Sequence, residues 1–203
     1  LNPDANLQPG CVAALVTAFK GQPVPTIVGA RVLNVDGTEQ RGGRRGEVTP
    51  ISTVLSFGQL TRRYPKLAGF EIHRENEPVP GAPVPMPTIS GACFAMRRRD
   101  FEALNGFDEG YFLHVEDIDL CWRARRSGGQ VLFQPKAQVV HLGHTSLEHP
   151  VKVEFHKGVG LTRYFIKRAD SLQLFAAAVL LAPAIMLMSV CRPLLWKLTG
   201  RPI

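Results

Sequence analysis

The sequence has few cysteines, and none of them lie at the paired spacings that bind metals or form disulfide frameworks. Cys11, Cys93, Cys121 and Cys191 are scattered through 203 residues without a CxxC pair. This pattern argues against a zinc knuckle and against a small disulfide-stapled fold. Each cysteine has apolar neighbours, so we expect small buried hydrophobic residues in a reducing compartment.

The given sequence shows no internal repeat, no low-complexity tract and no signal-peptide pattern. Its first residue is Leu1, and the Leu1–Asp4 segment reads as the end of a strand entering a turn, so we expect a larger domain with an N-terminal part beyond this sequence. An apolar fraction of 45% suits a packed core. The net charge of +7 favours an anionic partner. Nucleic acid is not expected, because the basic residues are not interleaved with aromatic residues in a recognisable binding fold.

Strand and helix signals alternate along much of the chain, which predicts an α/β layer fold. Periodicity and turn residues predict helices over 11–19, 101–104 (capped by Asp100) and 116–126. Strands are expected over 26–29, 30–35, 89–96, 130–133 and 138–142, with an Asp36-Gly37 turn and a break at Pro135.

Residues 40–88 have a different character, which predicts a long loop excursion. Residues 41–46 are basic and glycine-rich, residues 52–64 favour a short helix, and the proline-rich run 78–87 excludes a helix or a central strand. Such a segment is either a functional lid or a variable connector.

The C-terminal region is apolar and carries basic flanks. Residues 156–168 read as a basic amphipathic helix, and Leu174–Cys191 contains no charged residue over 18 positions. A bilayer-spanning helix needs roughly 20 residues, so a spanning segment, an interfacial helix and a buried helix all remain open. We expect membrane association and divide the chain into a domain at 1–168 and a hydrophobic segment at 169–203.

A cluster of three carboxylates, Glu116, Asp117 and Asp119, begins the predicted helix 116–126. Charges packed so closely need compensation by solvent, the helix N-terminus, a cation or a polyhydroxyl substrate. A simple helix cap is the structural alternative to a catalytic role.

Several motifs around this cluster together resemble glycosyltransferase family 2, in its rhamnosyltransferase-like branch. They are Ser90-Gly91-Ala92, Gly106-Phe107-Asp108-Glu109, Glu116-Asp117 followed by Leu120 and Arg123, and Val140-His141-Leu142-Gly143 followed by Ser146. Asn2-Pro3-Asp4 is similar to the position of the family's metal-binding DxD motif. The resemblance covers about residues 1–168 and implies a partial GT-A fold, a Rossmann-like mixed sheet flanked by helices, without its N-terminal nucleotide-binding half.

The resemblance implies an inverting glycosyltransferase that uses a nucleotide-sugar donor and a cell-envelope glycan or a lipid-linked acceptor. Asp117 is the expected general base, with Glu116 beside it to tune the base or orient the acceptor. Asp4 and His141 are the expected ligands of Mg²⁺ or Mn²⁺. Donor or acceptor contacts are expected from Ser90, Gly91, Ala92, Lys157 and Arg163.

The sequence also allows other interpretations of these candidate residues and of the whole chain. His141 also fits a packed histidine at a strand end, His144 is a weaker candidate of the same kind, and Arg123 fits a brace of the acidic helix better than a substrate ligand. A retaining reaction is compatible with the fold. The chain as a whole also fits a non-catalytic truncated remnant that binds glycan or membrane. The expected location is the cytoplasmic face of the bacterial inner membrane, as a peripheral or single-span protein.

Overall fold

The computed structural model describes residues 1–143 and 149–199, with side chains described up to Pro193. His144 and Ser146 therefore lie outside the described residues, as do the side chains of Trp196 and Lys197. The chain forms two compact units. Unit 1 comprises Leu1–Glu47, His73–Asp108 and Glu116–Ser146, and unit 2 comprises Val48–Ile72, Glu109–Val115 and Leu147–Ile203.

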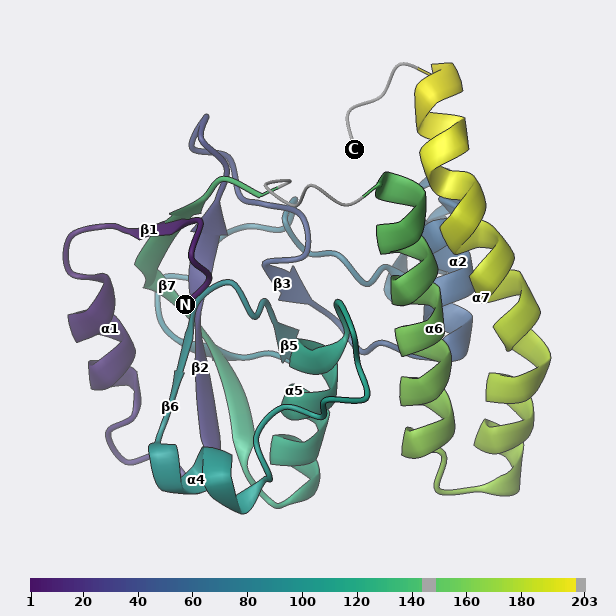
Figure 1. The fold of residues 1–203 in the computed structure, drawn as a ribbon. Helices are drawn as coiled ribbons and strands as arrows, with labels where there is room; N and C mark the ends of the chain where they lie inside the picture. Colours follow the sequence, from purple (N-terminus) through teal and green to yellow (C-terminus); the bar gives the residue numbers. More distant parts are fainter. Residues whose placement is uncertain (144–148, 200–203) are drawn as a thin grey trace. The chain divides into compact units, whose positions relative to one another are not determined.

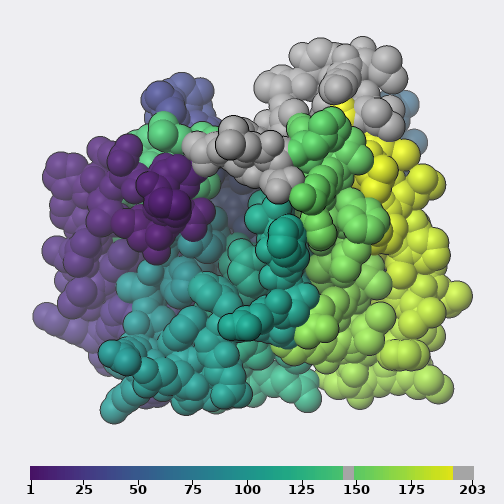
Figure 2. All heavy atoms as spheres, in the orientation of Figure 1, coloured from purple at the N-terminus to yellow at the C-terminus, as the bar shows by residue number. Residues whose placement is uncertain are grey.

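A mixed β-sheet forms the centre of unit 1 (Figure 1). Its longest strand, β7 (Gln130–His141), pairs in parallel with β2 (Thr26–Leu33). The short strands β1 (Ala5–Leu7) and β4 (Val84–Pro85) pair antiparallel with β7, and β6 (Phe94–Met96) pairs antiparallel with β2. Figure 2 shows the N-terminal atoms in purple on the surface of unit 1, beside green atoms from the end of β7.

Helices cover both faces of this sheet, and the expected α/β class is confirmed. Helix α1 (Cys11–Ala18) packs with Val28, Val32 and Val139 on one face. Helix α5 (Glu116–Arg126) packs with Ile27, Val131 and Phe133 on the other face. Because successive residues of β2 point to opposite faces, the strand is apolar throughout.

The cysteines behave as their apolar neighbours predict. All four are free; Cys11, Cys93 and Cys121 are buried, and Cys191 is partly buried.

Several predicted boundaries were wrong for identifiable reasons. Residues 26–33 form one strand, and β7 continues through Pro135, where a shift in register absorbs the proline. The strand predicted over 89–96 is two strands, β5 (Thr88–Ile89) and β6, separated by residues 90–93. Helix α4 (Arg98–Ala103) is preceded by Arg97 as its N-cap, so Asp100 lies inside the first turn and does not cap the helix.

Much of the region expected as a loop excursion has regular structure. It contains β3 (Arg44–Arg45), α2 (Pro50–Phe57), α3 (Leu60–Arg63), a 3₁₀ helix (Pro65–Phe70) and β4. Within the proline-rich run 78–87, β4 is the short strand that joins the sheet. It pairs with β7 and lies outside the main strand order β1-β7-β2-β6. Residues 40–47 and 73–88 belong to unit 1, whereas the segment between them belongs to unit 2.

Unit 2 is helical. Helix α6 (Pro150–Arg168) starts before the predicted boundary and packs against α7 (Leu172–Thr199), where Gly158 lies close to Met186 and Ser189. Residues Leu172–Pro193 of α7 have a mean hydropathy of 2.4 and are 17% buried, so α7 is long and apolar enough to cross a membrane. A domain boundary at residue 168 stays a prediction.

Candidate active site

Asp117 lies at the start of α5, and both oxygens of its carboxylate accept hydrogen bonds. Oδ2 accepts hydrogen bonds from the Gly91 backbone N–H at 3.0 Å and from Arg45 Nη2 at 2.9 Å. Oδ1 accepts from the Ile118 N–H at 2.8 Å and from Arg45 Nη1 at 3.3 Å. The Asp117 side chain is 10% exposed and that of Arg45 is 16% exposed. The compensation for this carboxylate is therefore a cation, one of the four possibilities that the sequence suggested, and that cation is the side chain of Arg45.

The backbone that leads into α5 is strained. His114 and Val115 adopt positive φ angles of 64° and 75°. A β-branched residue such as Val115 rarely adopts this conformation, and consecutive left-handed residues persist only where surrounding contacts require them. Such strain is common at functional sites. Here the two strained residues directly precede Glu116, the first residue of α5.

Glu116 lies next to this ion pair in a different environment. Its Oε2 atom is buried, and no described residue forms a hydrogen bond to it. Burial raises the pKa of the Glu116 carboxyl, and the neighbouring Asp117 charge raises it further. The two adjacent carboxyls therefore differ, because Asp117 forms an ion pair with Arg45 whereas burial raises the pKa of Glu116.

Asp119 is a structural residue of the same helix. Its carboxylate is fully buried and accepts from Arg123 Nε at 2.7 Å. Arg123 also donates to the carbonyl groups of Leu104 and Gly106, so it ties α5 to the loop after α4. The expectation that Arg123 braces the acidic helix is confirmed.

Arg45 is the site residue that sequence reasoning missed. It lies on β3, in a stretch that the sequence presented only as basic and flexible. Seventy-two positions separate it from Asp117, so no local pattern links the two. A signal was available in the alternation of β3, because Arg44 and Arg45 are adjacent in a strand and must point to opposite faces.

The segment Ser90–Ala92 lies against Asp117, as the small residues of this motif suggested. A Cβ atom added at Gly91 would lie 3.3 Å from Asp117 Cβ, so a larger residue here would press on the carboxylate. The Ser90 N–H donates to the Gly43 carbonyl at 3.0 Å, and the Ala92 carbonyl accepts from the Asn2 N–H at 2.9 Å. The same segment thus connects Asp117 with Gly43, which precedes β3, and with Asn2, which precedes β1.

Asp4 and His141 meet at the end of the sheet. Ala5 of β1 pairs with His141 of β7, which brings Asp4 Oδ1 to 3.1 Å from His141 Nε2. Asn2 Nδ2 lies 3.3 Å from the same ring nitrogen. The side chains of Asp4 and His141 are 16% and 15% exposed. The two predicted metal ligands are therefore neighbours, although 137 positions separate them.

Gln40 orients the His141 ring. Its Nε2 donates to the His141 carbonyl and to Asn34 Oδ1, each at 3.2 Å, which turns its Oε1 toward His141 Nδ1 at 2.8 Å. In this arrangement Nδ1 faces the Gln40 oxygen, and Nε2 faces the Asp4 carboxylate. A carboxylate oxygen and a nitrogen lone pair at this separation need a proton or a metal ion between them.

The pair fits a divalent ion as a partial site. Metal–ligand distances of about 2.1 Å put adjacent ligands roughly 3 Å apart, which the Asp4–His141 separation matches. Gln40 binds the other ring nitrogen of His141, which is a hydrogen bond that metal-bound histidines commonly make. Among the described residues, no group of three or more His, Cys, Asp or Glu side chains is arranged to hold a metal.

Lys157 and Arg163 lie on α6 in unit 2 and have partners there. Lys157 Nζ is 3.6 Å from Glu154 and lies over the Phe57 ring. The Arg163 guanidinium lies over the Tyr111 ring and close to the Gly110 backbone. Their predicted roles in substrate binding stay predictions.

Comparisons with known proteins agree with the motifs. The sequence model of the family described as "Glycosyltransferase like family 2" matches residues 7–157. The N-acetylglucosaminyl-diphospho-decaprenol L-rhamnosyltransferase of Mycobacterium tuberculosis is 29% identical over 69% of this chain and 45% of its own length. The rhamnosyltransferase WbbL of Escherichia coli K12 is 40% identical over 27% of this chain and 21% of its own length.

Two further similarities are more remote. The low-salt glycan biosynthesis hexosyltransferase Agl10 of Haloferax volcanii is 28% identical over 62% of this chain and 36% of its own length. A crystal structure of GalNAc-T7 with UDP, GalNAc and Mn²⁺ aligns with a TM-score of 0.42 at 18% identity, covering 87% of this chain and 36% of that one. The chain thus spans less than half the length of these relatives.

Proposed function

The chain belongs to glycosyltransferase-like family 2, and from this membership we propose that it takes part in transferring a sugar from a nucleoside-diphosphate donor to an acceptor hydroxyl. The observation that carries the proposal is the Asp117 carboxylate, held buried beside the small-residue segment Ser90–Ala92. That segment leads to the Asp4–His141 pair through the Asn2 hydrogen bond. A proton acceptor and a candidate site for the leaving diphosphate are thus connected within unit 1.

In the proposed reaction Asp117 is the general base. It takes the proton of the acceptor hydroxyl as the hydroxyl oxygen attacks the anomeric carbon in line. The bond from the anomeric carbon to the diphosphate breaks on the opposite side, so the configuration inverts. Glu116, with its raised pKa, is neutral over a wider pH range than an ordinary glutamate and can donate a hydrogen bond to the acceptor.

Asp4 and His141 are the residues that would hold a divalent Mg²⁺ or Mn²⁺ ion. When bound, the ion supplies positive charge to the departing nucleoside diphosphate. Asn2 replaces the first carboxylate of the family's metal motif, so the described residues provide one carboxylate and one imidazole at this position. Its contribution is to orient these two groups, with Gln40 holding the ring of His141.

The names of the relatives guide the substrate class. Two of them are rhamnosyltransferases, and one name specifies a diphospho-decaprenol acceptor. We infer a rhamnose or related hexose donor and a polyprenyl-diphosphate-linked glycan acceptor.

Helix α7 supports an encounter with such an acceptor at a membrane. Leu180 is 76% exposed and Leu187 is 65% exposed, although both are large apolar residues. Lys167 and Arg168 precede the helix and suit the anionic cytoplasmic leaflet of a bacterial inner membrane. We propose that α7 attaches the protein to this membrane surface.

The test is transfer by the purified protein. Nucleoside-diphosphate-rhamnose, Mn²⁺ and a polyprenyl-diphosphate-linked N-acetylglucosamine acceptor should yield a disaccharide product, detected by mass spectrometry, with an inverted anomeric centre by NMR. Calorimetry should also detect metal-dependent binding of a nucleoside diphosphate. Absence of both product and metal-dependent binding would instead indicate a non-catalytic module that binds glycan or membrane.

A further inference from the structure

Two adjacent arginines of β3 have opposite environments. Arg44 is 1% exposed and donates to Glu39 at 2.5 Å and to the Glu77 carbonyl at 2.9 Å, and its guanidinium lies over the Phe133 ring. Arg31 donates to the same Glu39 carboxylate at 3.2 Å. These contacts lie within a network that joins β2, β3 and the segment before the proline-rich run. Arg44 therefore has a structural role, because its buried guanidinium binds Glu39 and the Glu77 carbonyl.

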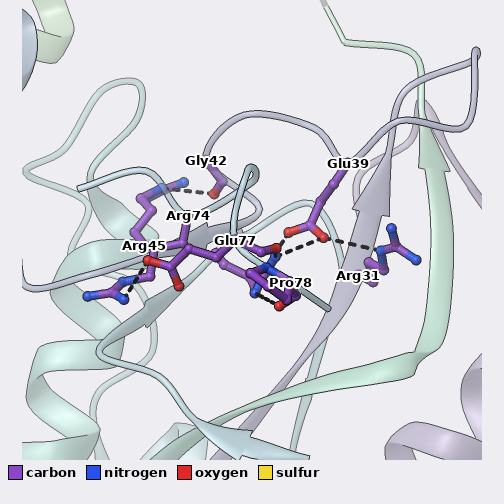
Figure 3. A network of polar contacts seen from close by, with 8 residues as sticks. Arg31, Glu39, Gly42, Arg45, Arg74, Glu77 and Pro78 are labelled. Carbon is purple, nitrogen blue, oxygen red and sulfur yellow. Dashed lines mark hydrogen bonds and ion pairs between the residues drawn. The ribbon is translucent and has the colours of Figure 1, made fainter. Parts of the chain in front are cut away.

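Arg45 lies on the opposite face of β3 from Arg44, and a hydrogen bond from its Nε atom holds its guanidinium in place. Its Nε donates to the Gly42 carbonyl at 2.9 Å (Figure 3). Gly42 has a φ angle of +84°, and a Cβ atom added there would lie 3.3 Å from Arg45 Nε. A turn that favours glycine thus sets the direction in which the two terminal nitrogens of Arg45 face Asp117.

Four hydrogen bonds join Asp117 to Arg45, Gly91 and Ile118, and their lengths distinguish its two oxygens. A carboxylate offers about four lone-pair positions, and all four are occupied here. Oδ2 is held by Arg45 Nη2 and the Gly91 N–H at 2.9 and 3.0 Å. The longest of the four bonds, at 3.3 Å, joins Oδ1 to Arg45 Nη1. It is the bond that an acceptor hydroxyl would replace at the lowest cost.

We propose that Arg45 is a positioning residue for the transfer reaction: it anchors Oδ2 of Asp117 and presents Oδ1 to the acceptor hydroxyl. This inference rests on the proposed function. The hydroxyl displaces Arg45 Nη1, and its proton passes to Oδ1 as its oxygen bonds to the anomeric carbon. The electron pair of the breaking bond leaves with the diphosphate, and Oδ1 afterwards releases the proton to water.

Removing the Arg45 charge has a consequence that a purely structural arginine lacks. Loss of the adjacent cation favours the protonated form of the Asp117 carboxyl and so raises its pKa. As the pH is lowered, activity should therefore be lost at a higher pH than in the wild type. Other ionisable groups near this pair are Glu116 and Cys121 of α5, whereas His73 bridges to the Arg45 backbone. Strands β2, β5 and β7 meet α5 through apolar side chains such as Ile27, Ile89 and Val131.

The experiment compares Arg45→Gln and Arg45→Lys with Arg44→Gln and Arg31→Gln, two control variants in the neighbouring network. The kcat and KM of the purified protein are measured with nucleoside-diphosphate-rhamnose from pH 5 to 9, per folded molecule. Arg45→Gln should lower kcat by roughly a hundredfold, as for a misplaced catalytic group, with the donor KM nearly unchanged. The acid limb of its kcat profile should move up by about one pH unit. Arg45→Lys should keep the limb and recover part of kcat, because lysine retains the charge without the fork.

The control variants should lose stability without moving the acid limb. An unmoved limb in Arg45→Gln, or a loss of kcat no greater than in Arg44→Gln, would overturn the positioning role. Should Arg45→Gln fail to fold, Arg45→Lys and Gly91→Ala decide, since the methyl group added at Gly91 would press on the Asp117 side chain. Unchanged kcat in both would refute the inference. An inactive wild-type protein would instead refute the proposed function.

Discussion

The exchange of Asp117 for asparagine tests the centre of the proposed mechanism. Asparagine has nearly the same shape but cannot take up the proton of an acceptor hydroxyl. General-base catalysis contributes about 10²- to 10⁴-fold, which corresponds to roughly 3–5 kcal/mol of transition-state free energy. We therefore expect Asp117→Asn to reduce kcat by at least a hundredfold while nucleoside diphosphate still binds, because Asp4 and His141 are unchanged.

The same exchange also affects stability, and the structure gives the size of the effect. Removing one partner of a buried ion pair costs about 3–5 kcal/mol when the other charge is left uncompensated. Asparagine keeps one acceptor oxygen and Arg45 is 16% exposed, so we expect the lower end of that range. Urea unfolding of both proteins measures this term and allows activity to be expressed per folded molecule.

Asp119→Asn is the matched control. Asp119 lies two positions further along α5, is fully buried and also pairs with an arginine. Its loss should destabilise the protein to a similar extent and leave kcat per folded molecule within about threefold, because Arg123 still binds two carbonyl groups. Transfer by Asp117→Asn within tenfold of wild type, or equal inactivity of Asp119→Asn, would refute the assignment of Asp117 as the base.

Three further predictions concern the metal pair, the titration of Glu116 and helix α7. Gln40→Ala releases the His141 ring and should weaken Mn²⁺ binding by about 10- to 100-fold, measured by electron paramagnetic resonance; unchanged affinity would contradict a metal role for His141. The pKa of Glu116 is raised above its ordinary value of 4.5 in the folded state, so the folded state binds more protons and the free energy of unfolding falls as the pH rises through that window. Glu116→Gln should remove this loss, so its stability gain over wild type in urea unfolding should be larger at pH 7.5 than at pH 4, and an equal gain would contradict it. Leu180→Glu and Leu187→Glu should each weaken binding to phosphatidylglycerol vesicles by roughly tenfold in flotation assays. Val35→Glu, at a residue 75% exposed in unit 1, should not, and equal effects of all three would argue against α7 as the membrane contact.

Local sequence patterns determined much of this protein without its structure. Apolar periodicity and glycine stops specified α1 and α5, because helix formation depends on residues within a few turns of one another. The proline-rich run correctly excluded a helix, since proline lacks the N–H donor. The motif set around Glu116-Asp117 was sufficient to identify the family, because its members are close in sequence and their spacing is specific.

The interactions that make a site were decided by tertiary structure alone. Asp117 meets Arg45 across 72 positions, and Asp4 meets His141 across 137. Strand pairing creates both encounters, and the register of β1 on β7 or of β3 on β5 depends on the packing of the whole sheet. The basic stretch before Glu47 therefore looked like solvated loop, whereas the alternating faces of β3 bury Arg44 with Glu39 and direct Arg45 to Asp117. The sequence was sufficient to select Asp117 as the candidate base, whereas only the tertiary structure identified Arg45 as the cation that binds it.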